Sequence, residues 1–315
     1  ICSDRRYVML LAAWFDTIIN FDNFGQLLPL VYPSIIAAMI LGVLAGLIGP
    51  LIQARDMAFA VHGTAELSFA GAACALWLGS SVILGAVVGS MLAGTILALM
   101  GLDGKNRNSL IGIMLPFGLG LGVLFLSLYQ GRSSNKFGLL TGQIVAITPA
   151  ELQGMVIVAV IVLAVLAVFG QRMLFAAIDP QIARAQHINL TVLSLLFMLT
   201  LSLVVAVSVQ FVGALLLLSL LITPTAAATQ VTASPIWVYG LSVLFAMTAG
   251  VGGILLSLGP GLPISPYITT VSFLIYLICW GIGSYRRRHG WSKRRLLAAA
   301  DGAKPASNCS LNPPT

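Results

Sequence analysis

Charged side chains are scarce in this sequence of 315 residues. Lys and Arg number 16, Asp and Glu number 9, and together they make up 8% of the chain, against 59% hydrophobic residues. A water-soluble domain carries about 25% charged residues. The shortage excludes an ordinary soluble protein and predicts an integral membrane protein.

Sequence motifs of catalytic sites and of zinc fingers are also missing. The cysteines Cys2, Cys74, Cys279 and Cys309 form no C-x-x-C pair, and the chain has 3 histidines. There is no Ser-His-Asp arrangement, no H-E-x-x-H motif and no G-x-x-x-x-G-K-[ST] loop. We therefore expect a protein that is no enzyme, binds no cofactor and hydrolyses no ATP itself. The net charge of +7 resides mostly in short loops and the C-terminal tail, which argues against nucleic-acid binding.

Long apolar runs, in contrast, are abundant. A transmembrane helix needs about 20 mostly apolar residues. The run after Phe211 is the weakest candidate, because almost no loop separates it from the run before it. The predicted fold is all-α, a polytopic membrane helix bundle of eight or nine transmembrane helices. The candidate runs are Ser34–Gln53, Ala58–Leu78, Val82–Leu102, Ser109–Tyr129, Leu152–Gly170, Thr191–Val209, Phe211–Thr229, Ile236–Leu258 and Ile268–Tyr285.

The 32 glycines are concentrated within these runs, as at Gly85, Gly89 and Gly94. Small residues let membrane helices approach closely where lipid supplies no hydrophobic drive between them. We interpret the glycines as sites of tight helix packing and not as a phosphate-binding loop.

The runs divide the chain into a lead-in over residues 1–33, a transmembrane domain over 34–285 and a basic tail over 286–315, expected to be disordered. Basic residues remain on the cytoplasmic side of a membrane, so the tail is predicted to be cytoplasmic. Counting back through the runs places Arg184 and Arg55 on the same side and the N-terminus outside. The expected location is the cell membrane, plasma or inner, with several crossings.

Glu66 is the one acidic residue well inside an apolar run. It lies about 16 Å along a helix from Arg55, near the middle of the membrane. A carboxylate there costs at least about 2.5 kcal/mol unless it faces a polar partner or cavity. His62 is four residues earlier, so both side chains share one helix face.

Three interpretations of this pair remain open from the residues alone. An imidazole nitrogen and a carboxylate oxygen are suitable ligands for Zn²⁺, Mn²⁺ or Fe²⁺. The two side chains would supply half of the ligands of a four-coordinate metal site. Alternatively, the two side chains satisfy each other by a hydrogen bond, or they relay protons.

Four segments in order resemble one family. Arg55 to Gly79 (RDMAFAVHGTAELSFAGAACALWLG) is similar to a second-helix motif in which Asp and His stand four apart. Phe137 to Leu152, Ile178 to Leu190 (IDPQIARAQHINL) with the run VAVSVQFVGALLLLSLLITPTAAATQ, and Gly252 to Ile268 match further segments. The chain resembles the membrane permeases of ABC importers for zinc and manganese, the ABC-3 type. It departs from the family pattern in that His62 stands where the family has Asp and Glu66 where it has His.

The resemblance implies a type II ABC importer permease that moves a divalent cation, zinc or manganese, into the cytoplasm. It implies His62 and Glu66 as metal ligands, two copies of the chain around a two-fold axis, and an external or periplasmic metal-binding protein. ATP would be hydrolysed by separate cytoplasmic ATPase subunits.

The resemblance also assigns the cytoplasmic segment from Asp179 to Asn189 to contact with the ATPase. Asp179, Ala183 and Arg184 are its candidate coupling residues. Asp179 is a favourable N-cap residue, and proline is favoured at the first helical position, where Pro180 stands, so the pair predicts the start of a helix.

Pro224 interrupts an apolar run and frees a backbone carbonyl, which predicts a kinked or short helix near the pathway. A packing kink is the plain alternative. Ser68, Ser219 and Thr223 are candidates for lining the same route, although interhelical hydrogen bonds explain them equally well.

Two other function classes compete with an importer permease. An ion- or proton-coupled secondary transporter is expected to show inverted repeats and a buried charge network, and the sequence shows neither. An intramembrane enzyme needs a catalytic set, which His62 and Glu66 do not form.

Overall fold

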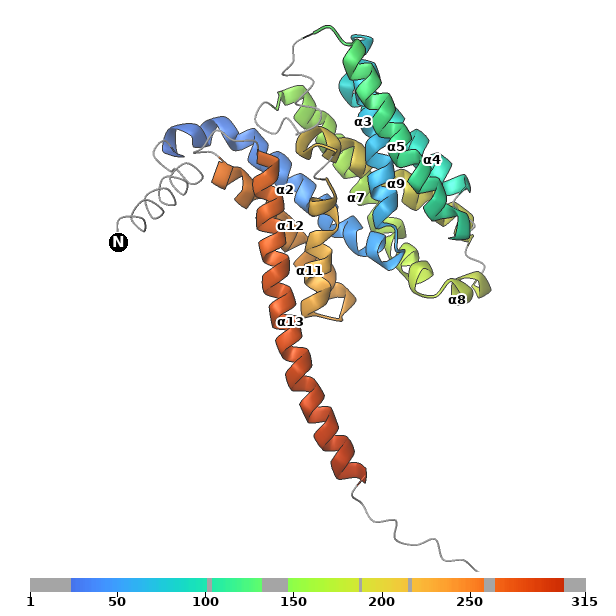
Figure 1. Ribbon diagram of the computed structural model, residues 1–315, viewed down its shortest axis with the longest axis vertical. Coiled ribbons are helices and arrows are strands. Elements are labelled where there is room, and N and C mark those ends of the chain that lie inside the picture. Colours follow the sequence, from blue (N-terminus) through green and yellow to red (C-terminus); the bar gives the residue numbers. More distant parts are fainter. Residues whose placement is uncertain are drawn as a thin grey trace, which may run out of the picture.

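A computed structural model describes residues 24–100, 104–131, 147–186, 189–214, 217–257 and 264–302. Within these ranges every regular element is an α-helix (Figure 1). The helices are α2 (Phe24–Ala54), α3 (Ala58–Trp77), α4 (Val82–Met100), α5 (Gly104–Leu128), α7 (Pro149–Ile178), α8 (Pro180–Ala185), α9 (Leu190–Val212), α10 (Leu217–Leu221), α11 (Thr223–Val231), α12 (Pro235–Ser257) and α13 (Ile264–Gly302).

The predicted membrane bundle is confirmed. Among the described residues, 8 helices are long and apolar enough to cross a membrane, namely α2, α3, α4, α5, α7, α9, α12 and α13. The residues predicted as the N-terminal lead-in lie partly outside the described range. From Phe24 onward they already belong to α2.

The run predicted from Phe211 to Thr229 is not one continuous helix. α9 ends at Val212, where Gly213 adopts φ +88, and the chain resumes as the short helices α10 and α11. A positive φ is accessible to glycine at little cost, so Gly213 permits the sharp turn that ends α9. The interruption near Pro224 was predicted from the sequence, but the break at Gly213 was not.

α10 and α11 nevertheless cover the length of the bundle beside α13. The Ser265 hydroxyl donates to the Val212 carbonyl at 2.9 Å, and the Ser272 hydroxyl donates to the Ser219 carbonyl at 3.0 Å. At the far end, Arg286 Nη1 donates to the Val231 carbonyl at 2.9 Å. Residue numbers rise together along both segments, so the broken segment runs parallel to α13 from one end of its membrane span to the other.

α13 continues past its membrane span as a helix through Gly302 and projects beyond the rest of the bundle (Figure 1). The tail was expected to be disordered, and for residues 286–302 the structure differs. Gly290 is the only strong helix breaker between Arg286 and Asp301, and the good helix formers Leu296 to Ala300 follow it. Residues 303–315 lie outside the described residues.

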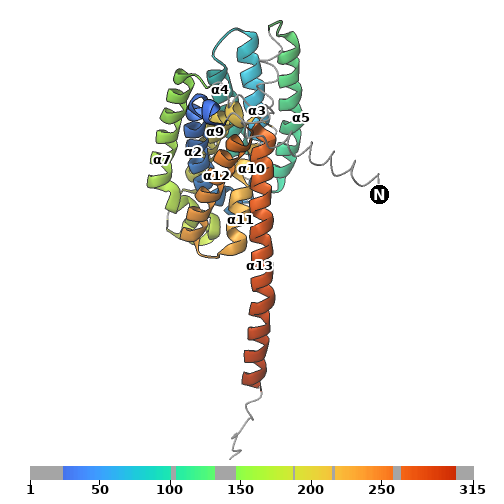
Figure 2. The same cartoon turned by 90° about the vertical axis from the view of Figure 1, so that its left-hand side faces the viewer.

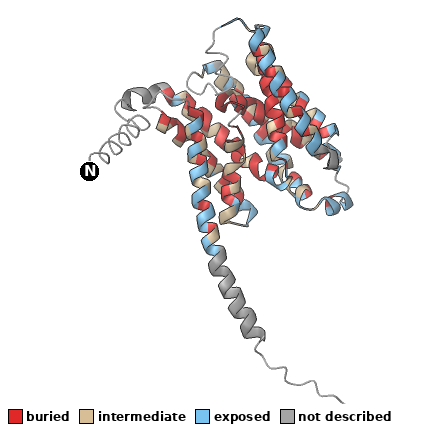
Figure 3. Ribbon diagram, in the orientation of Figure 1, coloured by how far each residue is buried: buried red, intermediate tan, exposed pale blue. Residues whose placement is uncertain are grey.

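α3 occupies the middle of the bundle, where buried residues gather (Figure 3). It packs against α4, α5 and α9, and its membrane window is 67% buried. α7, by contrast, lies at the edge, on the opposite side of the bundle from α5 (Figure 2), and its window is 17% buried. The candidate side chains on α3 are therefore held inside protein, while α7 presents most of its surface outward.

Candidate functional site

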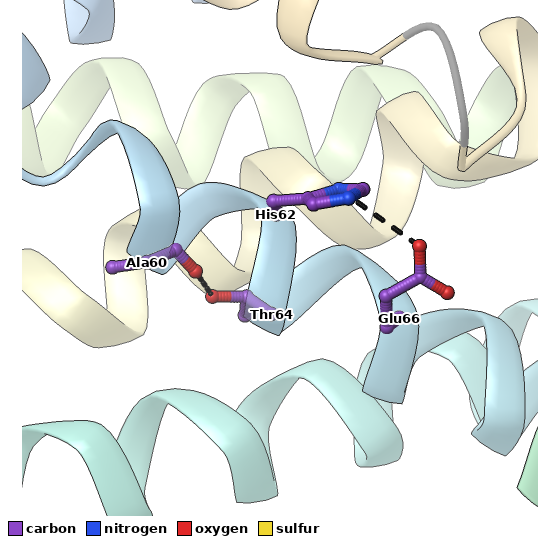
Figure 4. Close-up of polar contacts among 4 residues, drawn as sticks. All are labelled: Ala60, His62, Thr64 and Glu66. Carbon is purple, nitrogen blue, oxygen red and sulfur yellow. Dashed lines mark hydrogen bonds and ion pairs between the residues drawn. The ribbon is translucent and has the colours of Figure 1, made fainter. Parts of the chain in front are cut away.

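His62 and Glu66 point toward each other from successive turns of α3 (Figure 4). Their atoms Nδ1 and Oε1 are 3.8 Å apart, and the side chains are 29% and 4% exposed. The sequence prediction that they share one helix face is confirmed by this geometry. The carboxylate is buried, whereas the imidazole reaches the surface of the single chain.

The pair is not a self-satisfied hydrogen bond. A distance of 3.8 Å exceeds the roughly 3.2 Å limit of an N–H···O bond. In the described part of the chain, His62 Nδ1 and Glu66 Oε2 are buried atoms without a hydrogen-bond partner. Buried polar groups without partners are costly, which favours a ligand that completes them.

The separation fits one divalent cation. Zinc bonds to imidazole nitrogen and to carboxylate oxygen are each about 2.0–2.2 Å long, so an ion placed between Nδ1 and Oε1 at 3.8 Å reaches both atoms. No group of 3 or more His, Cys, Asp and Glu side chains able to hold a metal occurs among the described residues. Within the described part of one chain, the pair is therefore not joined by a third side chain of these types.

Other polar side chains on α3 behave differently. The Thr64 hydroxyl donates to the Ala60 carbonyl one turn back, and the Ser68 hydroxyl donates to the Ala86 carbonyl of α4 at 3.1 Å. Ser68 is thus explained by an interhelical hydrogen bond. On this helix, unsatisfied polar atoms are confined to His62 and Glu66.

The backbone of α5 passes directly over Glu66. A Cβ built on Gly118 would lie 3.0 Å from Glu66 Cβ and 3.0 Å from Leu67 N, so a larger residue would push the two helices apart. Gly118 therefore lets α5 pack closely on α3 at Glu66. The sequence predicted that glycines within the apolar runs serve tight helix packing, but not which residue each one meets.

The segment predicted to be cytoplasmic forms the short helix α8, as its sequence predicts. Asp179 Oδ1 accepts hydrogen bonds from the amides of Gln181 and Ile182 at 3.1 and 3.0 Å, and Pro180 opens the helix. Ala183 is fully buried against the bundle and Arg184 is exposed. Ala183 therefore anchors α8 and does not face a partner, while Arg184 and the 50% exposed Ile182 do face outward.

Replacing Asp179 with Ala is expected to loosen α8. Loss of an N-cap costs about 1 kcal/mol, because the amides of Gln181 and Ile182 lose their acceptor. Amide exchange at these two residues should accelerate about fivefold. Hydrogen–deuterium exchange of the purified protein measures it, with the same substitution at exposed Gln186 as the control. Equal exchange in both variants would contradict the capping role.

Pro224 stands in the first turn of α11 and not within a longer helix. Proline is tolerated at this position, because the first amides of a helix have no partner within it. The predicted short helix is confirmed, and Pro224 is buried. Its neighbour Thr225 is also buried, with an oxygen that has no hydrogen-bond partner in the described residues.

A bundle of helices long and apolar enough to span a membrane, with a polar histidine–carboxylate pair on one of its most buried helices, is the architecture of a membrane transport protein. The chain belongs to the ABC 3 transport family, which it matches over residues 28–282.

Individual relatives agree with this assignment. The manganese transport system membrane protein MntC of Halalkalibacterium halodurans is 27% identical over 248 residues, which is 78% of this chain and 82% of that protein. The high-affinity zinc uptake system membrane protein ZnuB of Haemophilus influenzae is 25% identical over 252 residues, which is 79% of this chain and 96% of that protein. In the structure of PsaBC from Streptococcus pneumoniae in complex with Fab, one chain matches with a TM-score of 0.71 and 26% identity. The match covers 86% of this chain and 95% of that one.

Proposed function

We propose that the chain is the transmembrane permease subunit of an ABC importer that moves a divalent metal cation, Zn²⁺ or Mn²⁺, into the cytoplasm. Family membership over residues 28–282 supports the permease role. The names of MntC and ZnuB support manganese and zinc as the cargo class. The unsatisfied pair His62 and Glu66 is the observation in this chain that carries the proposal.

In this proposal the cation passes between two copies of the chain. His62 is 29% exposed, so a second copy can approach it. Two copies related by a two-fold axis would supply two imidazoles and two carboxylates, which is enough for a four-coordinate ion. A metal-binding protein outside the membrane would deliver the ion.

Energy would come from separate ATPase subunits in the cytoplasm that dock on α8. Asp179 fixes the start of this helix, Ala183 ties it to the bundle, and Arg184 with Ile182 presents the outward contact surface. Movement of the ATPase would be transmitted through Ala183 to α7 and α9, which α8 contacts. Pro224 would allow the α10–α11 segment to adjust beside α3.

A secondary transporter is not favoured. Such a transporter couples to ions through its own buried charge network, and His62–Glu66 is the one ion pair between described membrane-span residues. The family and its named relatives point to an ABC importer instead.

Replacing Ile182 with Asp is expected to weaken ATPase binding at least tenfold. The exposed isoleucine side chain gains by leaving water at an interface, and full burial of such a side chain contributes about 1.5–3 kcal/mol. Pull-down of the co-expressed ATPase measures this. Exposed Ile178, replaced by Asp in the same way, is the control, because it lies at the end of α7 outside α8. Undiminished ATPase capture by the Ile182→Asp variant would remove α8 from the docking surface.

A further inference from the structure

An apolar trench runs along α2 between α7 and α12, both of which pack on α2. The part farther from Ala54, called the upper part, has a volume of about 310 Å³ and is lined by Leu47, Leu163 and Ala167, among others. The lower part has a volume of about 400 Å³. Leu174 and Tyr239 line both parts, so the two adjoin along one trench.

The trench leads to a third, more polar cavity of about 490 Å³ at the end of the bundle predicted to be cytoplasmic. Ala54 lines both the trench and this cavity. Arg55, Asp56 and Arg184 contribute charged side chains to it. Two arginines against one aspartate leave an excess of positive charge.

Arg55 is a cation without an anionic partner among the described residues. Its Nη1 donates to the Ser194 hydroxyl at 3.4 Å, its guanidinium carbon lies 4.6 Å from the centre of the Phe197 ring, and its Nε is buried without a partner. Burial lowers the pKa of Arg55 to about 10, so it remains charged near neutral pH. Guanidinium groups bind phosphate and carboxylate well.

The trench has about the length of one lipid leaflet. From Leu163 to Leu174 the helix rises about 16 Å, close to half of a hydrocarbon core about 30 Å thick. α7, which forms one wall, is 17% buried over its membrane window and stands at the edge of the bundle (Figure 2). The trench therefore faces the surroundings of the protein and needs an occupant that is apolar along its length and anionic at one end.

We propose that this trench binds one anionic phospholipid, with an acyl chain along α2 and the headgroup phosphate at Arg55. Arg184 stands at the rim of the same cavity as a second cation. An acidic side chain of an ATPase would use only the polar end, and a second copy of this chain would not require Arg55. A lipid accounts for both the apolar and the cationic part, and basic pockets between membrane helices are known to take anionic headgroups.

The test is native mass spectrometry of the purified permease complex with phosphatidylglycerol or phosphatidylcholine added at equal concentration. The parent protein should retain one phosphatidylglycerol per permease chain and at least tenfold less phosphatidylcholine. Arg55→Gln should lower phosphatidylglycerol retention at least tenfold. Arg172→Gln is the matched control, because Arg172 is an exposed arginine on α7 that lines none of the three cavities.

A second variant guards against a folding defect at Arg55. Ala167→Trp fills the upper trench far from Arg55, and it should displace phosphatidylglycerol while leaving the subunit composition of the complex unchanged. Equal retention of the two lipids, or full retention in both variants, overturns the proposal. Loss of the ATPase on Arg55→Gln without loss of lipid would assign the cavity to the ATPase, and loss of the second permease copy on Ala167→Trp would assign the trench to the subunit interface.

Discussion

Metal uptake should fall at least about 100-fold when Glu66 is replaced by Gln. Removing partners that only support a metal ligand costs 10–100-fold in affinity, so removing a ligand itself should cost no less. Glutamine keeps the volume of the side chain, and it is cheaper to bury in a membrane than a carboxylate. The loss would therefore reflect ligand chemistry and not misfolding. Uptake of radioactive Zn²⁺ and Mn²⁺ by cells whose only importer contains this permease measures it.

Two companion variants sharpen this result. Glu66→Asp keeps the charge but shortens the side chain by one methylene group, so uptake should lie between that of the parent and that of the Glu66→Gln variant. His62→Ala removes the nitrogen ligand and should abolish uptake, with the ATPase still bound in pull-down. Uptake of both metals within twofold of the parent in the Glu66→Gln variant would show that the carboxylate holds no cation.

Gly71→Ala should destabilise the bundle by about 2–3 kcal/mol, in the upper part of the range for overpacking. A Cβ at this position would collide with the Gly85 carbonyl oxygen and lie 3.0 Å from Gly89 Cα. Both obstacles are backbone atoms of α4, which cannot rotate away as a flexible side chain can. The two helices must separate, and Ser68 would lose its hydrogen bond to Ala86. Thermal unfolding of the detergent-purified protein measures the effect.

Gly112→Ala is the matched control on α5. It makes the same chemical change, but a Cβ there meets nothing within 4 Å. Because alanine is the better helix former, this variant should be stabilised by about 0.5–1 kcal/mol. Unfolding temperatures that fall equally in the two variants would mean that close packing of α3 on α4 is not what the glycine provides.

The helices with the strongest sequence signals were those whose apolar runs are long and bounded by polar turns. α3 and α4 were predicted within two residues at each end, since Arg55 and Asp56 precede α3 and Gly79 to Ser81 separate it from α4. The segment after Phe211 shows the limit of the method. Hydropathy counts apolar side chains and does not register that Gly213 turns the backbone, whereas Pro224 did predict an interrupted helix.

The sequence predicted that His62 and Glu66 lie side by side on one helix, but not how the neighbouring helices bury them. The i, i+4 spacing of His62 and Glu66 requires only a helix, and α3 supplies it. That Glu66 is buried where Gly118 of α5 meets its backbone and Cβ depends on how α5 crosses α3, which no local pattern encodes. The same reasoning applies to Ala183, whose fully buried position on α8 follows from packing between α7 and α9.

Equilibrium dialysis of the purified permease with Zn²⁺ or Mn²⁺ tests most directly the claim that His62 and Glu66 bind the cation, because it measures metal binding independently of transport. One ion should bind for every two chains, and X-ray absorption should show nitrogen and oxygen ligands without sulfur. The variant carrying both His62→Ala and Glu66→Gln should bind none. Unchanged binding in that variant, or sulfur in the coordination shell of the parent protein, would contradict the account.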